Sequence, residues 1–211
     1  MTGTPRVLLL HGLWMHAPAM RWLAARLRAN GFDARPLGYY SVLQSTEAAV
    51  ARIAAALQPG EHVVAHSLGG LMALQAALQG EAPAGRIVCL GTPLAGSGAA
   101  RAVHSRVPAG ARLIGPHLAT LEAGVPRIPE ALQVGMVAGR VRRGLGGIVA
   151  RFEDDHDGTV AVAETRVPGL ADHCLVDASH SGLIFSDAAA AQAIAFLRAG
   201  RFEHAPGRAD V

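Results

Sequence analysis

The chain has 211 residues, of which 51% are hydrophobic and 17% are charged, and its formal net charge is +3. This length suits one domain with a sizeable core, and the composition excludes a disordered chain, which would have fewer apolar and more charged residues. Aromatic residues make up only 4% of the chain and do not interleave with arginine runs, so we expect no nucleic-acid partner.

Short apolar runs alternate with helical patterns along the chain. The expected strands cover residues 6–10, 32–37, a run through Val63 and Val64, 86–90, 132–138 and 173–176. The expected helices cover residues 17–30, a segment from Ser45 or Thr46 to about 57, 68–78 and 187–199. This alternation predicts an α/β fold: a mostly parallel sheet of about six strands with helices on both faces. Pro36 favours an edge position for the second strand.

Residues 95–129 differ from the rest, with small residues, several prolines and no clear strand. They predict one helix plus loops over the sheet edge, which could be a lid or pocket wall or only a connecting segment. We find no repeat or linker and therefore expect one domain over residues 1–211, with a core at about 6–199 and a frayed tail after Arg201.

The junction at Ser67 joins a buried strand directly to a helix. Ala65 lies two residues before this serine and Gly69 two residues after it. Small neighbours allow the backbone to turn sharply, so this pattern is typical of a nucleophile elbow, which exposes a serine at the sheet edge. An ordinary strand-to-helix junction is the alternative.

A serine hydroxyl needs a base to take its proton, and His180 is the best candidate. It follows the last expected strand in a loop of small residues, and an imidazole that titrates near pH 6.5 suits a base at neutral pH. We expect His66 to be directed away from the site, although it adjoins Ser67. His173 lies at the wrong end of its strand.

Such a base needs a carboxylate that holds its tautomer, and Asp157 is our candidate. It lies between the last two strands and heads a turn with Gly158. The rival carboxylates are Asp154, Asp155 and Asp177. A calcium-binding loop is a weaker interpretation of this segment, because its potential ligands include Glu153, Asp155, Asp157 and Glu164 but no second flanking helix follows.

Acyl transfer also requires hydrogen-bond donors for an oxyanion. We expect the backbone amides of Leu68, directly after the nucleophile, and of Leu13, after the first strand, to serve as this oxyanion hole. Apolar residues near the strand ends could line an acyl pocket or only shield the sheet edge: Trp14, Met15, Tyr39, Tyr40 and Leu94.

With these motifs the sequence resembles small lipase- and esterase-like members of the α/β-hydrolase superfamily, similar to bacterial lipases and inositol-deacylase-like hydrolases. The similar motifs are His11–Gly12, His66–Gly70, Gly91–Pro93, Asp157–Val160 and His180–Leu183. The resemblance implies the α/β-hydrolase fold with a minimal cap or none, and a triad in the chain order Ser67, Asp157, His180. Ala65 departs from the family pattern, which has glycine there.

The resemblance implies a serine esterase or lipase that cleaves a small-molecule or lipid ester through an acyl-enzyme, with no cofactor and no metal. An acyltransferase with the same triad and a non-catalytic binding protein remain alternatives. We expect no transmembrane segment and a cytoplasmic location, because the apolar run before His11 is too short for a secretory signal. Cys89 and Cys174 are expected to be buried thiols, although a disulfide stays open.

Overall fold

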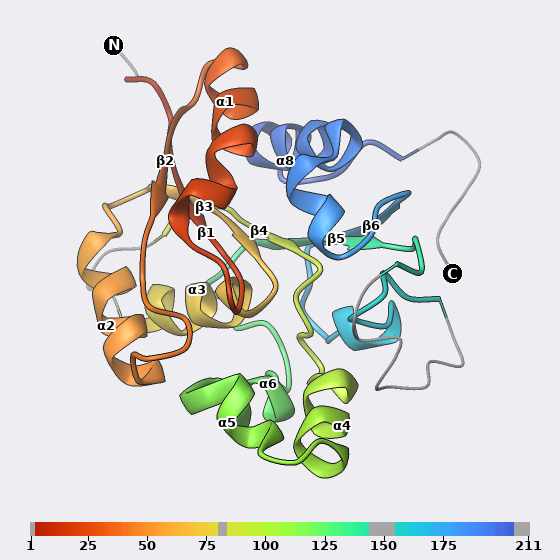
Figure 1. Ribbon diagram of the computed structural model, residues 1–211. Coiled ribbons are helices and arrows are strands. Elements are labelled where there is room, and N and C mark those ends of the chain that lie inside the picture. Colours follow the sequence, from red (N-terminus) through yellow and green to blue (C-terminus); the bar gives the residue numbers. More distant parts are fainter. Residues whose placement is uncertain (1–2, 80–83, 144–154, 205–211) are drawn as a thin grey trace.

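The computed structural model describes residues 3–79, 84–143 and 155–204, and it places one sheet at the centre of the molecule (Figure 1). In spatial order the strands are β2 (Asp33–Leu37), β1 (Arg6–Leu10), β3 (His62–His66), β4 (Ile87–Leu90), β5 (Val134–Gly139) and β6 (Asp172–Val176). All neighbouring strands pair in parallel, which confirms the predicted sheet. The strand with Pro36 is at an edge, as predicted, where a residue that cannot donate to the ladder is tolerated.

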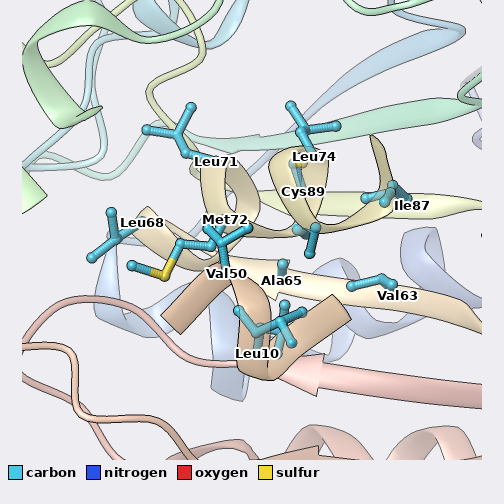
Figure 2. Packing of buried hydrophobic residues seen from close by; sticks show 14 of the residues in the cluster. Leu10, Val50, Val63, Ala65, Leu68, Leu71, Met72, Leu74, Ile87 and Cys89 are labelled. Atoms are coloured by element: carbon cyan, nitrogen blue, oxygen red, sulfur yellow. The ribbon is translucent and has the colours of Figure 1, made fainter. Parts of the chain in front are cut away.

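Helices cover both faces of the sheet (Figure 1). The main helical segments are η1 (Ala17–Met20), α1 (Arg21–Ala29), α2 (Thr46–Ala56), α3 (Leu68–Gln79) and α8 (Asp187–Ala199). Side chains of α2 and α3 pack with one face of the strands in a first core (Figure 2), whereas side chains of α1 and α8 pack with the other face in a second core. Because these strands are buried on both faces, β1 and β4 are almost wholly apolar, and β3 is apolar between its two terminal histidines.

Local capping explains where two of these helices begin. The Ser45 hydroxyl accepts the Ala48 amide at the start of α2, and the Ser186 hydroxyl accepts the Ala189 amide at the start of α8. Of the two predicted caps for α2, Ser45 is therefore the observed one. The Thr46 hydroxyl instead lies 2.8 Å from His117 Nδ1, which joins α2 to the segment over residues 95–129.

The segment over residues 95–129 contains more helix than predicted. It forms α4 (Gly98–Arg106), α5 (Gly110–Ile114), η2 (Gly115–His117) and α6 (Leu118–Ala123). The prediction of one helix was wrong because Ala109 and Gly115, both with positive φ, interrupt the segment before and after α5, and no piece is longer than nine residues. Ala100, Ile114 and Leu121 pack into the first core, so the segment is an integral layer and no separate cap domain is formed among the described residues.

The C-terminal part of the described chain is held to the sheet beyond the predicted boundary. Phe202 is buried with its ring 4.9 Å from that of Phe196, and its amide donates to the Asp172 carboxylate. The predicted frayed tail after Arg201 is therefore wrong for residues 202–204, because Phe202 belongs to the second core, and residues 205–211 lie outside the described residues.

The two cysteines lie on opposite faces of the sheet. Cys89 packs in the first core and Cys174 in the second, so both are buried thiols and they form no disulfide with each other. No helix within the described ranges has the length and apolar character needed to cross a bilayer.

Candidate active site

Ser67 lies at the turn between β3 and α3, in a backbone conformation that non-glycine residues rarely adopt. Its φ is +54°, in the left-handed region, which costs about 1–2 kcal/mol for a residue with a side chain. Its amide donates to the Leu90 carbonyl at 2.9 Å, so the neighbouring strand β4 holds this turn. Ala65 remains in β3 outside the positive-φ region, and its extra methyl group is therefore accommodated.

Two glycines allow α3 to approach the sheet closely after this turn. A Cβ at Gly69 would lie 2.5 Å from the His11 carbonyl oxygen, and a Cβ at Gly70 would lie 2.1 Å from Thr92 Oγ1. Both contacts are shorter than atoms tolerate, so side chains here would push the helix away from β1 and β4. The small residues around Ser67 thus bring the N-terminus of α3 against three strand ends.

The structure brings Ser67, His180 and Asp157 together in one hydrogen-bonded chain. His180 Nε2 lies 3.0 Å from Ser67 Oγ, and His180 Nδ1 lies 2.7 Å from Asp157 Oδ2. Because a carboxylate only accepts, Nδ1 carries the proton, and Nε2 presents a lone pair to the serine hydroxyl. This is the arrangement in which an imidazole can take a proton from a serine.

Asp157 is itself held in place by backbone groups. Its Oδ1 accepts the amides of Thr159 and Val160 at 2.9 and 2.8 Å, and its backbone carbonyl accepts the His180 amide at 2.8 Å. The carboxyl group is buried, so these bonds replace the water it has lost. The turn predicted around Gly158 therefore presents one carboxylate oxygen to His180 and keeps the other one occupied.

The rival carboxylates have other partners. Asp155 pairs with Arg142 and Asp177 with Arg140 on the surface. Asp177 is exposed, and its hydrogen bond with Arg140 lowers the pKa of this carboxyl group. Asp154 lies outside the described residues.

The carboxylates that a calcium-binding loop would use as ligands have other partners where the structure describes them. Asp157 pairs with His180, and Glu164 accepts the amides of Gly98 and Ala161. Glu153 lies outside the described residues. Within the described ranges, no group of three or more histidine, cysteine, aspartate or glutamate residues could hold a metal ion.

The two predicted oxyanion donors belong to segments that border Ser67. Leu68 is the first residue of α3, and the first amides of a helix have no partner within the helix. Leu13 follows Gly12, where a Cβ would lie 3.1 Å from Ser67 Cβ. The loop after β1 therefore runs directly beside the serine.

The residues considered for an acyl pocket fall into two groups. Leu94 and Tyr39 are buried in the first core, and the Tyr39 ring stacks on His11 with its hydroxyl donating to the His11 carbonyl. Met15 packs against the second core. Trp14 and Tyr40 are exposed, so of the five residues these two present their side chains to solvent.

His66 lies inside the site, and the expectation that it would be directed away was wrong. Its ring is 4.7 Å from the His180 ring, and its Nε2 lies 2.9 Å from the His180 backbone oxygen. A carbonyl only accepts, so Nε2 carries the proton and His66 holds the loop of the candidate base. Its Nδ1 is buried, has no hydrogen-bond partner among the described residues, and packs against Gly12.

Burial lowers the pKa of His66 to about 3. An unfolded chain protonates this histidine near pH 6.5, so from pH 6.5 down to about 3 the unfolded state binds more protons and the free energy of unfolding falls as pH falls. We expect His66 to lower this free energy by about 2 kcal/mol between pH 7.5 and pH 5.

The substitution His66→Gln tests this expectation, because glutamine keeps a donor for the His180 carbonyl but does not titrate. Urea unfolding at the two pH values should show that the free energy of unfolding falls less from pH 7.5 to pH 5 in the variant than in the wild type. The other histidines with lowered pKa values, His11, His62 and His117, are present in both proteins and therefore contribute equally to both. Equal losses in the two proteins would contradict a buried neutral His66.

Comparisons with known proteins identify the fold. No protein-family model matches the sequence, and no curated protein matches it. Among solved structures, the lipase BlEst2 of Bacillus licheniformis in its mature form superposes with a TM-score of 0.73 at 20% identity, over 87% of this chain and 88% of that chain. The pyrethroid hydrolase PytH gives 0.63 at 15% identity, over 94% and 99% of the two chains.

A third structure, from Xanthomonas campestris pv. campestris and classed with the alpha/beta hydrolase superfamily, gives a TM-score of 0.52 at 17% identity, over 92% of this chain and 98% of that chain. These similarities cover most of every chain compared. The chain therefore has the α/β-hydrolase fold that the sequence motifs predicted.

Proposed function

We propose that this chain is a serine hydrolase of carboxylic esters, with Ser67 as nucleophile, His180 as general base and Asp157 as the carboxylate that orients it. The observation that carries this proposal is the continuous hydrogen-bonded chain from Asp157 Oδ2 through His180 to Ser67 Oγ. The strained backbone of Ser67 also supports it, because such strain persists where the surrounding structure holds a functional residue.

In the proposed reaction, His180 Nε2 takes the proton of Ser67 while Oγ attacks the ester carbonyl carbon. The oxygen of the carbonyl becomes negative and is stabilised by the amides of Leu13 and Leu68. The bond between the carbonyl carbon and the alcohol oxygen then breaks, and His180 returns the proton to the leaving alcohol. Water, activated by His180, attacks the acyl-enzyme and releases the acid and the free Ser67.

An apolar rim beside the site favours esters with an apolar acyl or alcohol group. The rim consists of four exposed side chains, Trp14, Tyr40, Leu43 and Leu113. The Trp14 indole donates to the Leu113 carbonyl at 2.8 Å, and a Cβ at Gly115 would lie 2.9 Å from the Val42 carbonyl, so the three segments that carry the rim are adjacent. By name, two of the structurally similar proteins are a lipase and a pyrethroid hydrolase.

The test combines turnover with covalent labelling. We expect wild type to hydrolyse p-nitrophenyl esters, with a preference among acyl lengths that reflects the rim, and to react with an activated organophosphonate. Mass spectrometry of the digested protein should locate the phosphonate on the peptide that contains Ser67. A folded Ser67→Ala variant serves as the control and should remain unlabelled.

Two outcomes would redirect the proposal. If an added alcohol takes the acyl group in preference to water, so that the main product is a new ester, the acyltransferase alternative is favoured. A wild type that neither hydrolyses esters nor accepts the phosphonate would favour a binding protein with this fold.

A cytoplasmic location stays a prediction, and the two buried thiols are compatible with a reducing compartment.

A further inference from the structure

Thr92, the second residue after β4, contacts the carbonyl group of Ser67. Its side chain is fully buried, and its hydroxyl donates to the Ser67 backbone oxygen at 2.9 Å. The same oxygen accepts the Gly70 amide at 2.9 Å. Two donors from different segments, the loop after β4 and the first turn of α3, therefore converge on one carbonyl group.

This carbonyl shares a rigid peptide unit with a proposed oxyanion donor. The Ser67 carbonyl and the Leu68 amide are the two ends of one planar trans peptide and point in opposite directions. A hydrogen bond that fixes the direction of the carbonyl therefore fixes the direction of the amide. It also polarises the peptide, which strengthens the amide as a donor.

We propose that Thr92 is a positioning residue that holds the Ser67–Leu68 peptide so that the Leu68 amide faces the substrate oxyanion. This inference rests on the proposed function of Ser67 and Leu68. Thr92 touches neither substrate nor the reacting atoms, and it acts only through the peptide that it holds.

The conformation of Ser67 explains why this peptide needs a hydrogen bond to keep its orientation. A non-glycine residue at φ +54° is about 1–2 kcal/mol less stable than in its ordinary conformations, so the turn relaxes if its neighbours allow it. An oxyanion donor must lie 2.7–3.1 Å from the position of the developing charge, and relaxation of the turn would move it. The buried hydrogen bond from Thr92, in the loop after β4, opposes that movement.

Gly70 provides the space through which Thr92 reaches the carbonyl. A Cβ at this position would lie 2.1 Å from Thr92 Oγ1 and 2.8 Å from Thr92 Cγ2. Glycine inside a helix is about 1 kcal/mol less favourable than alanine, so its presence in the first turn of α3 has a local cost. The close approach of Thr92 accounts for glycine at this position.

The test compares Thr92→Val, which loses the hydroxyl but keeps the shape, with Thr92→Ser, which keeps the hydroxyl. We expect Thr92→Val to lower kcat for a p-nitrophenyl ester by about 10²-fold, approaching the loss of one oxyanion donor, with KM little changed. Thr92→Ser should restore most of this loss. The pH profile of kcat/KM should be unchanged in both, because the contacts of His180 and Asp157 are untouched.

A boronic acid that forms a tetrahedral adduct with Ser67 supplies a second readout. Its affinity should fall in Thr92→Val by about the same factor as kcat, whereas that of an uncharged amide analogue of the substrate should not change. Thr165→Val is the matched control, because Thr165 is also a buried threonine whose hydroxyl donates to a backbone carbonyl, that of Val162. It should lower stability and leave kcat unchanged.

Three results would overturn the inference: wild-type kcat in Thr92→Val, an equal loss in Thr92→Ser, or unchanged boronate affinity. If the valine variant does not fold, Thr92→Ala removes the same hydroxyl without adding a methyl group in its place. A wild type without Ser67-dependent hydrolysis would refute the proposed function instead. Crystal structures of the wild type and of Thr92→Val would show directly whether the Leu68 amide changes direction when the Thr92 hydroxyl is lost.

Discussion

Replacing Ser67 with alanine is expected to lower kcat for p-nitrophenyl ester hydrolysis by about 10⁶-fold. The substitution removes the oxygen that lies 3.0 Å from His180 Nε2, so no acyl-enzyme can form at this position. The oxyanion donors and the binding surface remain, and such remaining groups typically sustain about 10³–10⁴-fold acceleration over water. Steady-state rates with active-site titration of the wild type would measure the loss.

Controls separate the loss of chemistry from the loss of structure. Circular dichroism and Tm should show that Ser67→Ala folds, because alanine occupies less space and keeps the same backbone constraint. A matched variant, Ser105→Ala, removes a serine hydroxyl that bonds within α4 and should retain full activity. Activity of Ser67→Ala close to that of wild type would exclude Ser67 as nucleophile.

The parts of the fold that could be predicted from sequence are those with local signals. The buried strands and the longer helices have clear hydrophobic periodicity, and the ends of parallel strands meet at one edge, so Ser67, Asp157 and His180 could be placed near each other. The helices α5 and α6 were missed because five or six residues are too few to show a period.

Contacts between distant segments left no local signal. His66 bonds to the carbonyl of His180, which lies 114 residues further along the chain, so its place beside the base depends on how the last loop folds. Thr92 was visible only as part of a strand-end motif, and its bond to Ser67 depends on the approach of α3 permitted by Gly70. Phe202 follows a helix-ending glycine, and its burial depends on Phe196 and Asp172.

The second large effect is expected for Asp157→Asn, which should lower kcat by about 10⁴-fold. In the wild type, Oδ1 accepts two backbone amides, from Thr159 and Val160, while Oδ2 accepts His180 Nδ1–H. An asparagine side chain has one oxygen, and the two amides require that oxygen at the Oδ1 position. The NH₂ group must then face His180 Nδ1.

This orientation of asparagine reverses the histidine tautomer. An NH₂ group can only donate, so Nδ1 must become the acceptor and the proton moves to Nε2. His180 then presents N–H instead of a lone pair to Ser67 Oγ and can no longer take its proton. The variant should still fold, since both backbone bonds to the side chain remain.

The rival Asp177 supplies the matched control for this experiment. Asp177→Asn changes an exposed carboxylate that pairs with Arg140, so kcat should stay at the wild-type level. A crystal structure of Asp157→Asn should show the three side chains in place, which would assign the loss to the tautomer and not to displacement. Full activity in Asp157→Asn together with a loss in Asp177→Asn would assign the acid to Asp177 instead. A loss in Asp157→Asn together with full activity in Asp177→Asn identifies Asp157 as the residue that keeps the proton of His180 on Nδ1.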